Sequence, residues 1–133
     1  MKHLSDYIQD EQTKLFKRLG IFFAFSDKQF EEWKAKDKTA EDYVWLGIGW
    51  MCCPKENAKE FLEQHKKLIE AGIQQDIKEN WIEKIIEREL INHEAYYTGE
   101  IEDTIDALSS YDVSYEQVKE VYKNTYEKNS ENF

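Results

Sequence analysis

The chain has 133 residues, the length of one compact domain. Apolar residues make up 41% and aromatic residues 14% of it, so intrinsically disordered and collagen-like proteins are excluded. With 18 basic and 28 acidic side chains the formal net charge is −10, which excludes a protein that binds nucleic acid through a basic surface.

We expect residues 1–133 to form a single domain with a frayed tail at 128–133, because the sequence shows no linker and no internal repeat. No apolar run approaches the roughly 18 residues that span a bilayer, and the N-terminus lacks a signal-peptide pattern. The adjacent Cys52 and Cys53 form no disulfide framework and fit a reducing compartment. These features predict a soluble, cytoplasmic protein without a membrane partner.

The first half of the chain shows patterns of both helices and strands. Residues 5–20 have apolar positions at helical spacing and end on a glycine, which predicts a helix. The aromatic run at 20–25 predicts a short strand, and a capping box at 26–29 begins a second helix. The run at 43–53 is rich in β-branched and aromatic residues, so we interpret it as a second strand; a buried helix is the alternative.

The second half of the chain is helical in pattern. Pro54 is expected to open a long helix that ends at Gly72, and further helices are expected at 77–93, at 101–108 and after a capping box at Ser114. The whole pattern predicts an α+β fold that is predominantly α-helical, with about six helices around a minimal two-stranded sheet. A purely helical bundle remains the alternative. We expect the core to contain the four tryptophans, Trp33, Trp45, Trp50 and Trp81, although a self-association surface and a homodimer stay open.

The negative charge is concentrated in one stretch. Residues 1–38 contain eight basic and seven acidic side chains, whereas residues 89–118 contain eight acidic side chains and no lysine or arginine. If Ile101, Ile105 and Leu108 are buried, the carboxylates between them must face outward, because they lie off the apolar stripe. A surface of unpaired like charges gains free energy when a basic partner neutralises it.

The expected partner-binding residues lie in and beside this stretch. Exposed tyrosines next to carboxylates suit protein recognition, since they offer rigid apolar area with a polar tip. The predicted site consists of Tyr96, Tyr97, Glu100, Glu102, Asp103 and Asp106. Three alternatives stay open: a solvated face that keeps the protein soluble, a cation site, and tyrosines that fold into the core.

Motifs of catalysis and metal binding are absent from the sequence. There is no HExxH, no CxxC, no glycine-rich phosphate loop and no nucleophile elbow. Glu89 and His93 lie four residues apart and form half of a metal site at most, and His65 is the next histidine, so core roles for both histidines are the alternative. Cys52 is either a thiol activated at a helix start or a small buried side chain. We expect no catalytic residues, no metal and no cofactor.

Three stretches resemble a family of small uncharacterised proteins encoded by phages, prophages and other mobile elements. They are FFAFSDKQFEE at 22–32, CPKENAKEFL at 53–62 and NHEAYYTGEIEDTIDAL at 92–108. The resemblance implies no activity, catalytic residue or cofactor. It implies a genomic context in which small acidic proteins occlude a host enzyme, sometimes by presenting carboxylates in place of phosphates.

The leading hypothesis is therefore a non-enzymatic acidic protein that inhibits a host defence or nucleic-acid-binding protein through a phosphate-mimicking surface. Its partner would be the basic surface of a host protein, with no direct contact to nucleic acid. A second hypothesis is a nucleotide-type ligand bound by the aromatic run at 43–50, with cations from Arg18, Lys55 or Lys59. A third is an enzyme or metal protein built on His65, His93 and Glu89.

Overall fold

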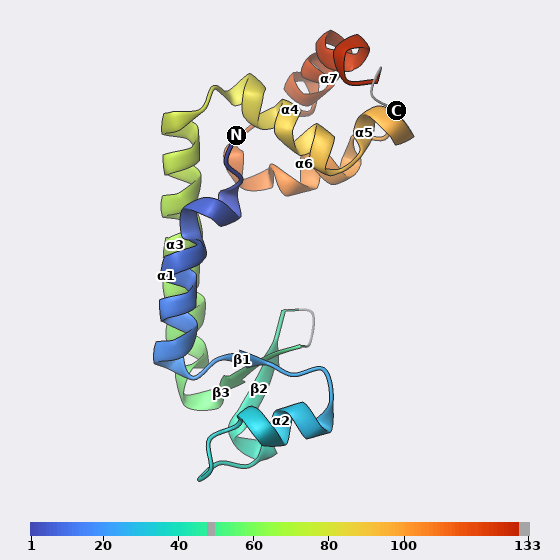
Figure 1. Ribbon diagram of the computed structural model, residues 1–133. Coiled ribbons are helices and arrows are strands. Elements are labelled where there is room, and N and C mark those ends of the chain that lie inside the picture. Colours follow the sequence, from blue (N-terminus) through green and yellow to red (C-terminus); the bar gives the residue numbers. More distant parts are fainter. Residues whose placement is uncertain (48–49, 131–133) are drawn as a thin grey trace. The chain divides into compact units, whose positions relative to one another are not determined.

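The computed structural model of the chain describes residues 1–47 and 50–130 (Figure 1). The chain divides into two compact units, Met1–Gly72, here called unit 1, and Ile73–Phe133, here called unit 2. The boundary between the units falls inside one long helix, α3 (Ala58–Glu79). The two units are described separately below, and the expectation of a single domain stays a prediction.

The fold is α+β and mostly helical, as the sequence predicts. No helix in the described part of the chain is both long and apolar enough to cross a membrane. Besides α3, the elements are α1 (Leu4–Leu19), β1 (Phe22–Phe23), α2 (Asp27–Trp33), β2 (Tyr43–Leu46), β3 (Met51–Pro54), α4 (Ile82–Asn92), α5 (Ala95–Thr98), α6 (Glu102–Ala107) and α7 (Tyr115–Ser130).

The sheet has three antiparallel strands in the order β1-β3-β2 within the described residues, rather than the two that we expected. The run at 43–53 is a hairpin of β2 and β3 and not one strand. The chain leaves β2 through Gly47, whose φ of 63° lies in the left-handed region that glycine adopts without strain. Ile48 and Gly49 lie outside the described residues. The central strand β3 pairs through Cys52 with both of its neighbours.

Each face of the sheet packs against a different layer of helix. Helices α1 and α3 cover one face, and α2 covers the other through Phe30. Because side chains alternate along a strand, neighbouring cysteines of β3 enter different clusters. The buried residues are Leu15, Leu19, Ile21, Cys53 and Phe61 on the first face, and Ala24, Phe30, Tyr43 and Cys52 on the second.

Side-chain caps are present at both predicted helix starts, although only the one at Ser114 is a complete capping box. The Ser26 hydroxyl accepts a hydrogen bond from the Gln29 backbone N–H at 3.2 Å, and the Gln29 side chain accepts one from the Phe25 N–H at 2.7 Å. Before α7 the pair is reciprocal, because the Ser114 hydroxyl accepts from the Gln117 N–H at 3.1 Å and the Gln117 side chain accepts from the Ser114 N–H at 2.8 Å. Each cap satisfies backbone donors that a helix start leaves unpaired, so α2 and α7 begin where the sequence predicts.

Helix α3 differs from its prediction at both ends. Pro54 ends β3 instead of opening the helix, which begins at Ala58. The helix also continues through Gly72, where we expected it to end. A Cβ atom at Gly72 would lie 2.4 Å from Cγ2 of Ile8 in α1, so this glycine serves close packing of the two helices, which run side by side in unit 1 (Figure 1).

The expectation that the tryptophans form the core is wrong. Trp33, Trp45, Trp50 and Trp81 are 65%, 51%, 44% and 80% exposed. Trp33 is the last residue of α2, Trp45 lies on the edge strand β2, and Trp81 caps α4. An element's end or edge has neighbours on fewer sides, so a large side chain there stays partly in solvent. The Trp50 ring packs against Phe25 at 5.4 Å between centroids.

Unit 2 is helical throughout its described part. The helix that we expected at 77–93 is two helices, because α3 ends at Glu79 and α4 begins at Ile82. Helices α4 to α7 pack around a core of fully buried side chains, which includes Ile85, Ile86, Leu90, Leu108 and Val118. The expected frayed tail overlaps α7, where Lys128 and Asn129 bind the Glu87 carboxylate, and residues 131–133 lie outside the described residues.

Candidate functional site

The carboxylates of the predicted site lie on and just before α6 and are exposed. Ile101, Thr104 and Leu108 are buried, so the helix turns this side toward the core. Ile105, which we also expected to be buried, is only partly buried, whereas the carboxylates of the helix face solvent as the apolar spacing predicts. We call the exposed set the acidic surface; it consists of Tyr97, Glu100, Glu102, Asp103 and Asp106.

Tyr96 does not belong to this surface, which corrects the expectation that both tyrosines are partner anchors. Its side chain is buried, its hydroxyl is hydrogen-bonded to the Thr125 hydroxyl, and its ring stacks on Tyr122 at 5.5 Å. Burial raises the pKa of Tyr96. Tyr97 is 73% exposed, so it is the tyrosine of this pair that an external partner can reach.

A buried charge network lies inside unit 2. The Arg88 guanidinium donates two hydrogen bonds to the Asp76 carboxylate, at 3.0 and 2.9 Å, and Tyr111 donates a third at 2.6 Å. Asp76 is fully buried and Arg88 nearly so. Burial opposes ionisation of Asp76, but the hydrogen bonds from Arg88, Tyr111 and Asn80 outweigh it and lower the pKa of this carboxyl group. We call this group of side chains the Asp76 network.

Other cations of unit 2 are also bound to carboxylates that are mostly buried. Lys128 and Lys84 lie 3.2 and 3.5 Å from the Glu87 carboxylate, and Arg88 also donates to Glu89 at 2.9 Å. The acidic surface takes part in none of the ion pairs found among residues 1–47 and 50–130. Unit 2 contains 6 basic and 15 acidic residues. Those of its lysine and arginine residues that form ion pairs bind Asp76, Glu87 or Glu89, none of which belongs to the acidic surface.

The histidines that we considered as ligands lie in separate units. His93 Nε2 is 3.6 Å from Glu89, which makes this half-site an ion pair when the ring is protonated. His65 is hydrogen-bonded to Gln12 at 3.0 Å and stacks on Phe61, and burial lowers its pKa. No group of three or more His, Cys, Asp or Glu side chains that could hold a metal ion occurs in the described part of the chain.

The two cysteines are buried on β3, so of the two alternatives the small buried side chain at the end of a strand is confirmed and the activated thiol at a helix start is wrong. Cys52 and Cys53 are fully inaccessible, and burial raises the pKa of both thiols. A thiol is nucleophilic as the thiolate, so a raised pKa together with burial makes both side chains inert core residues.

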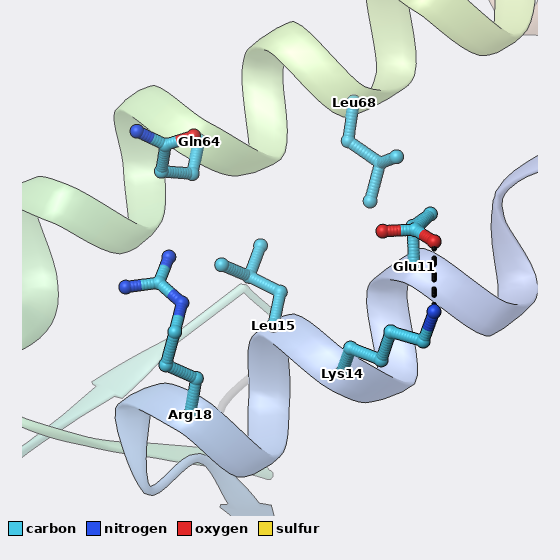
Figure 2. Close-up of a pocket in the computed structure, with 6 residues that line it drawn as sticks. All are labelled: Glu11, Lys14, Leu15, Arg18, Gln64 and Leu68. Carbon is cyan, nitrogen blue, oxygen red and sulfur yellow. Dashed lines mark hydrogen bonds and ion pairs between the residues drawn. The ribbon is translucent and has the colours of Figure 1, made fainter.

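Basic side chains line two of the hollows found among the described residues of unit 1. Figure 2 shows the first, about 230 Å³ between α1 and α3, where Leu15 and Leu68 form the apolar part and Lys14 is paired with Glu11. The second is about 330 Å³ and is lined partly by Lys17, Arg18, Trp33, Lys38 and Tyr43. Two of its cations are already paired, because Arg18 binds Glu60 at 2.6 Å and Lys38 binds Glu56 at 2.9 Å.

Comparisons with known proteins give a family without an assigned role. No curated protein and no solved structure matches the chain. One family model matches residues 4–128, which is nearly the full length. The chain therefore belongs to that family, DUF7659, a family of unknown function.

Proposed function

We propose that this chain is a non-enzymatic binding protein whose acidic surface docks on a basic surface of another protein. One observation carries the proposal: the carboxylates of Glu100, Glu102, Asp103 and Asp106 are exposed and outside every ion pair of the described residues. Like charges held this close repel one another, and a basic partner would remove the repulsion and steer its own approach. Tyr97 adds a rigid apolar contact beside them.

The finer form of the proposal is an inhibitor that imitates nucleic-acid phosphates. A protein groove that binds a phosphate backbone is lined with lysine and arginine and releases counterions on binding, and a row of carboxylates can satisfy the same cations. The target would then be a host defence or nucleic-acid-binding protein, in keeping with the resemblance to proteins of phages and other mobile elements. Direct binding to nucleic acid is disfavoured by the net charge of −10.

The test compares neutralising variants with the same number of changes in each unit. The triple variant Glu102→Gln, Asp103→Asn, Asp106→Asn removes charge from the acidic surface, and Asp10→Asn, Glu32→Gln, Glu41→Gln is the matched control on exposed carboxylates of unit 1. Proteins retained by the immobilised wild-type chain from a bacterial lysate are identified, and binding of each purified protein is then measured against salt.

We expect the first triple variant to weaken binding at least tenfold and to flatten its salt dependence, with the control unchanged. Duplex DNA should displace the partner if the surface imitates phosphates. A partner that binds both triple variants as tightly as it binds the wild type would overturn the proposal, and so would the absence of any retained protein.

A second candidate function rests on the larger hollow of unit 1. Lys17 and the exposed indole of Trp33 line it, which suits a ligand that carries both an anionic group and an aromatic ring, such as a nucleotide. Of the cations that we expected to serve such a ligand, Arg18 lines this hollow. Native mass spectrometry with ATP, NAD and cyclic nucleotides is the test. A bound nucleotide that is lost in Lys17→Ala and Trp33→Ala supports this function, and no bound species excludes it.

A further inference from the structure

A second acidic feature of unit 2 is a groove between α4 and α7. It has a volume of about 280 Å³, slightly below the usual range for small-molecule sites. Its apolar lining comes from Ile82 and Ile86 of α4 and from Val121 of α7. Ile86 is almost fully buried and Ile82 is partly accessible, so the base of the groove is apolar and the groove itself is open to solvent.

Polar groups from both helices complete the groove. Glu83 of α4 and Glu120 of α7 are exposed and supply one carboxylate from each helix, and Gln117 and Asn124 add carboxamides. Neither glutamate belongs to an ion pair within the described residues. The cation that follows Glu83 in the chain, Lys84, is bound to Glu87.

An arginine side chain matches this groove in shape and in charge. Its aliphatic stem covers apolar surface while the guanidinium stays at the polar rim, where its planar donors can bond carboxylates from two directions. Lysine also has an aliphatic stem, one methylene longer, but it ends in a compact ammonium with fewer donors. Trp81 directly precedes Ile82 and is 80% exposed, so its indole is accessible to a partner next to the groove, which it does not itself line.

We propose that the α4–α7 groove is an arginine-binding pocket that anchors one side chain of a basic partner protein. The inference rests on the proposed function, because it assumes that the partner is basic. It adds a second contact point in unit 2, formed by residues other than those of the acidic surface, and it names arginine as the side chain that is recognised. A partner that presents lysine instead of arginine to this groove should bind more weakly.

The experiment uses the full chain, labelled with ¹⁵N, and a peptide probe of about nine residues in which arginine and glycine alternate. The peptide with lysine in place of arginine is the matched probe. We expect the arginine peptide to shift the amide signals of Glu83, Ile86, Glu120 and Asn124 and the indole signal of Trp81. Glu83→Gln with Glu120→Gln should weaken that binding at least tenfold, and the lysine peptide should bind several-fold more weakly.

The outcomes separate this proposal from the proposed function. Shifts confined to residues 97–106, abolished by the triple variant of the acidic surface, would support the proposed function and overturn the groove. Equal binding of the arginine and lysine peptides would overturn arginine recognition. An absence of localised shifts with either peptide would count against both proposals. Glu83 and Glu120 are exposed, so the double variant should fold, and an unchanged melting temperature verifies this.

Discussion

Units 1 and 2 are of similar length but carry their charged side chains differently. Unit 1 has 12 basic and 13 acidic residues, whereas unit 2 has 6 and 15. The buried polar and charged side chains of the described residues all belong to unit 2, namely Asp76, Glu87, Arg88 and Thr104. Unit 1 instead buries apolar residues, and its ion pairs, such as Arg18–Glu60 and Lys38–Glu56, involve exposed glutamates.

Three of the six basic residues of unit 2 are bound to its more buried carboxylates. A buried carboxylate must be paired, because an uncompensated charge in a medium of low dielectric costs several kcal/mol. Arg88, Lys84 and Lys128 meet that need inside or at the edge of the core. These three cations are therefore not available to the exposed carboxylates, and the other basic residues of unit 2, Lys78, Lys119 and Lys123, take part in none of the ion pairs of the described residues.

The largest expected effect comes from breaking the Asp76 network. Asp76→Asn removes the carboxylate that accepts two hydrogen bonds from the buried Arg88 guanidinium and leaves Glu89 as its remaining acidic partner. We expect the free energy of unfolding to fall by about 3–5 kcal/mol. Urea denaturation gives the loss, and hydrogen exchange followed by mass spectrometry locates it. Exchange should accelerate most in residues 73–130.

The control for this variant is Asp10→Asn, an exposed carboxylate of unit 1 that should change stability by less than about 0.5 kcal/mol. If Asp76→Asn lowers the free energy of unfolding by less than about 1 kcal/mol, the Asp76 network is not needed for the stability of unit 2. Faster exchange spread evenly over both units would contradict the contrast between them.

When the pH is lowered, unit 2 should lose stability at a higher pH than unit 1. The pKa of Asp76 is lowered in the folded protein, and the pKa of Glu87 is lowered because hydrogen bonds from Asn129 and Lys128 outweigh its burial. A carboxyl group with a lowered folded-state pKa stabilises the fold above its unfolded pKa, and that stability is lost as the pH falls through the folded value. Stability should therefore decline below about pH 4.

The measurement is amide exchange from pH 7 down to pH 2.5, corrected for the intrinsic exchange rate. Amides of unit 2 should lose protection at a higher pH than those of unit 1. The Asp76→Asn variant should show a smaller loss of stability over this range, since it lacks the titrating group. Loss of protection in unit 1 first would refute the argument.

A smaller effect is expected at the close contact in unit 1. Gly72→Ala improves helix propensity by about 1 kcal/mol, but the new Cβ meets the Ile8 side chain at 2.4 Å and overpacks the interface at a cost of about 1–3 kcal/mol. We expect net destabilisation, measured by urea unfolding. In an Ile8→Ala background the same change should stabilise the chain. A stabilised single variant would contradict the packing role of Gly72.

Much of the fold could be predicted because its signals are local. The side-chain caps at Ser26 and Ser114 and the left-handed glycine at Gly20 place helix ends from a few adjacent residues. The hairpin could also have been found: a four-residue connection that contains glycine, between two apolar runs, is a hairpin signal. We took the run at 43–53 as one strand because it is apolar without a break.

The missed features depend on contacts between distant residues. Nothing near Arg88 marks it as buried, because its partner Asp76 lies twelve residues earlier on another helix. The same holds for Tyr96, whose partner Thr125 lies on α7. In contrast, the exposure of Glu102, Asp103 and Asp106 was predictable, because it follows from the apolar spacing of a single helix.

The smallest expected effects are on the acidic surface itself, and their signs should differ. Glu102 lies in the first turn of α6, where the positive end of the helix dipole stabilises a carboxylate, and Asp106 lies near the negative end. Glu102→Gln should therefore destabilise the chain and Asp106→Asn should stabilise it, each by a few tenths of a kcal/mol. Paired thermal unfolding experiments on the two variants measure the difference.

Both variants should weaken binding to a basic partner, although they change stability in opposite directions. Two equal losses of stability would mean that these carboxylates support the fold of unit 2, and the acidic surface would then need no partner to explain it. A loss of binding in Asp106→Asn, in a chain that has become more stable, would separate recognition from folding, because a residue whose charge costs stability has a role outside the fold.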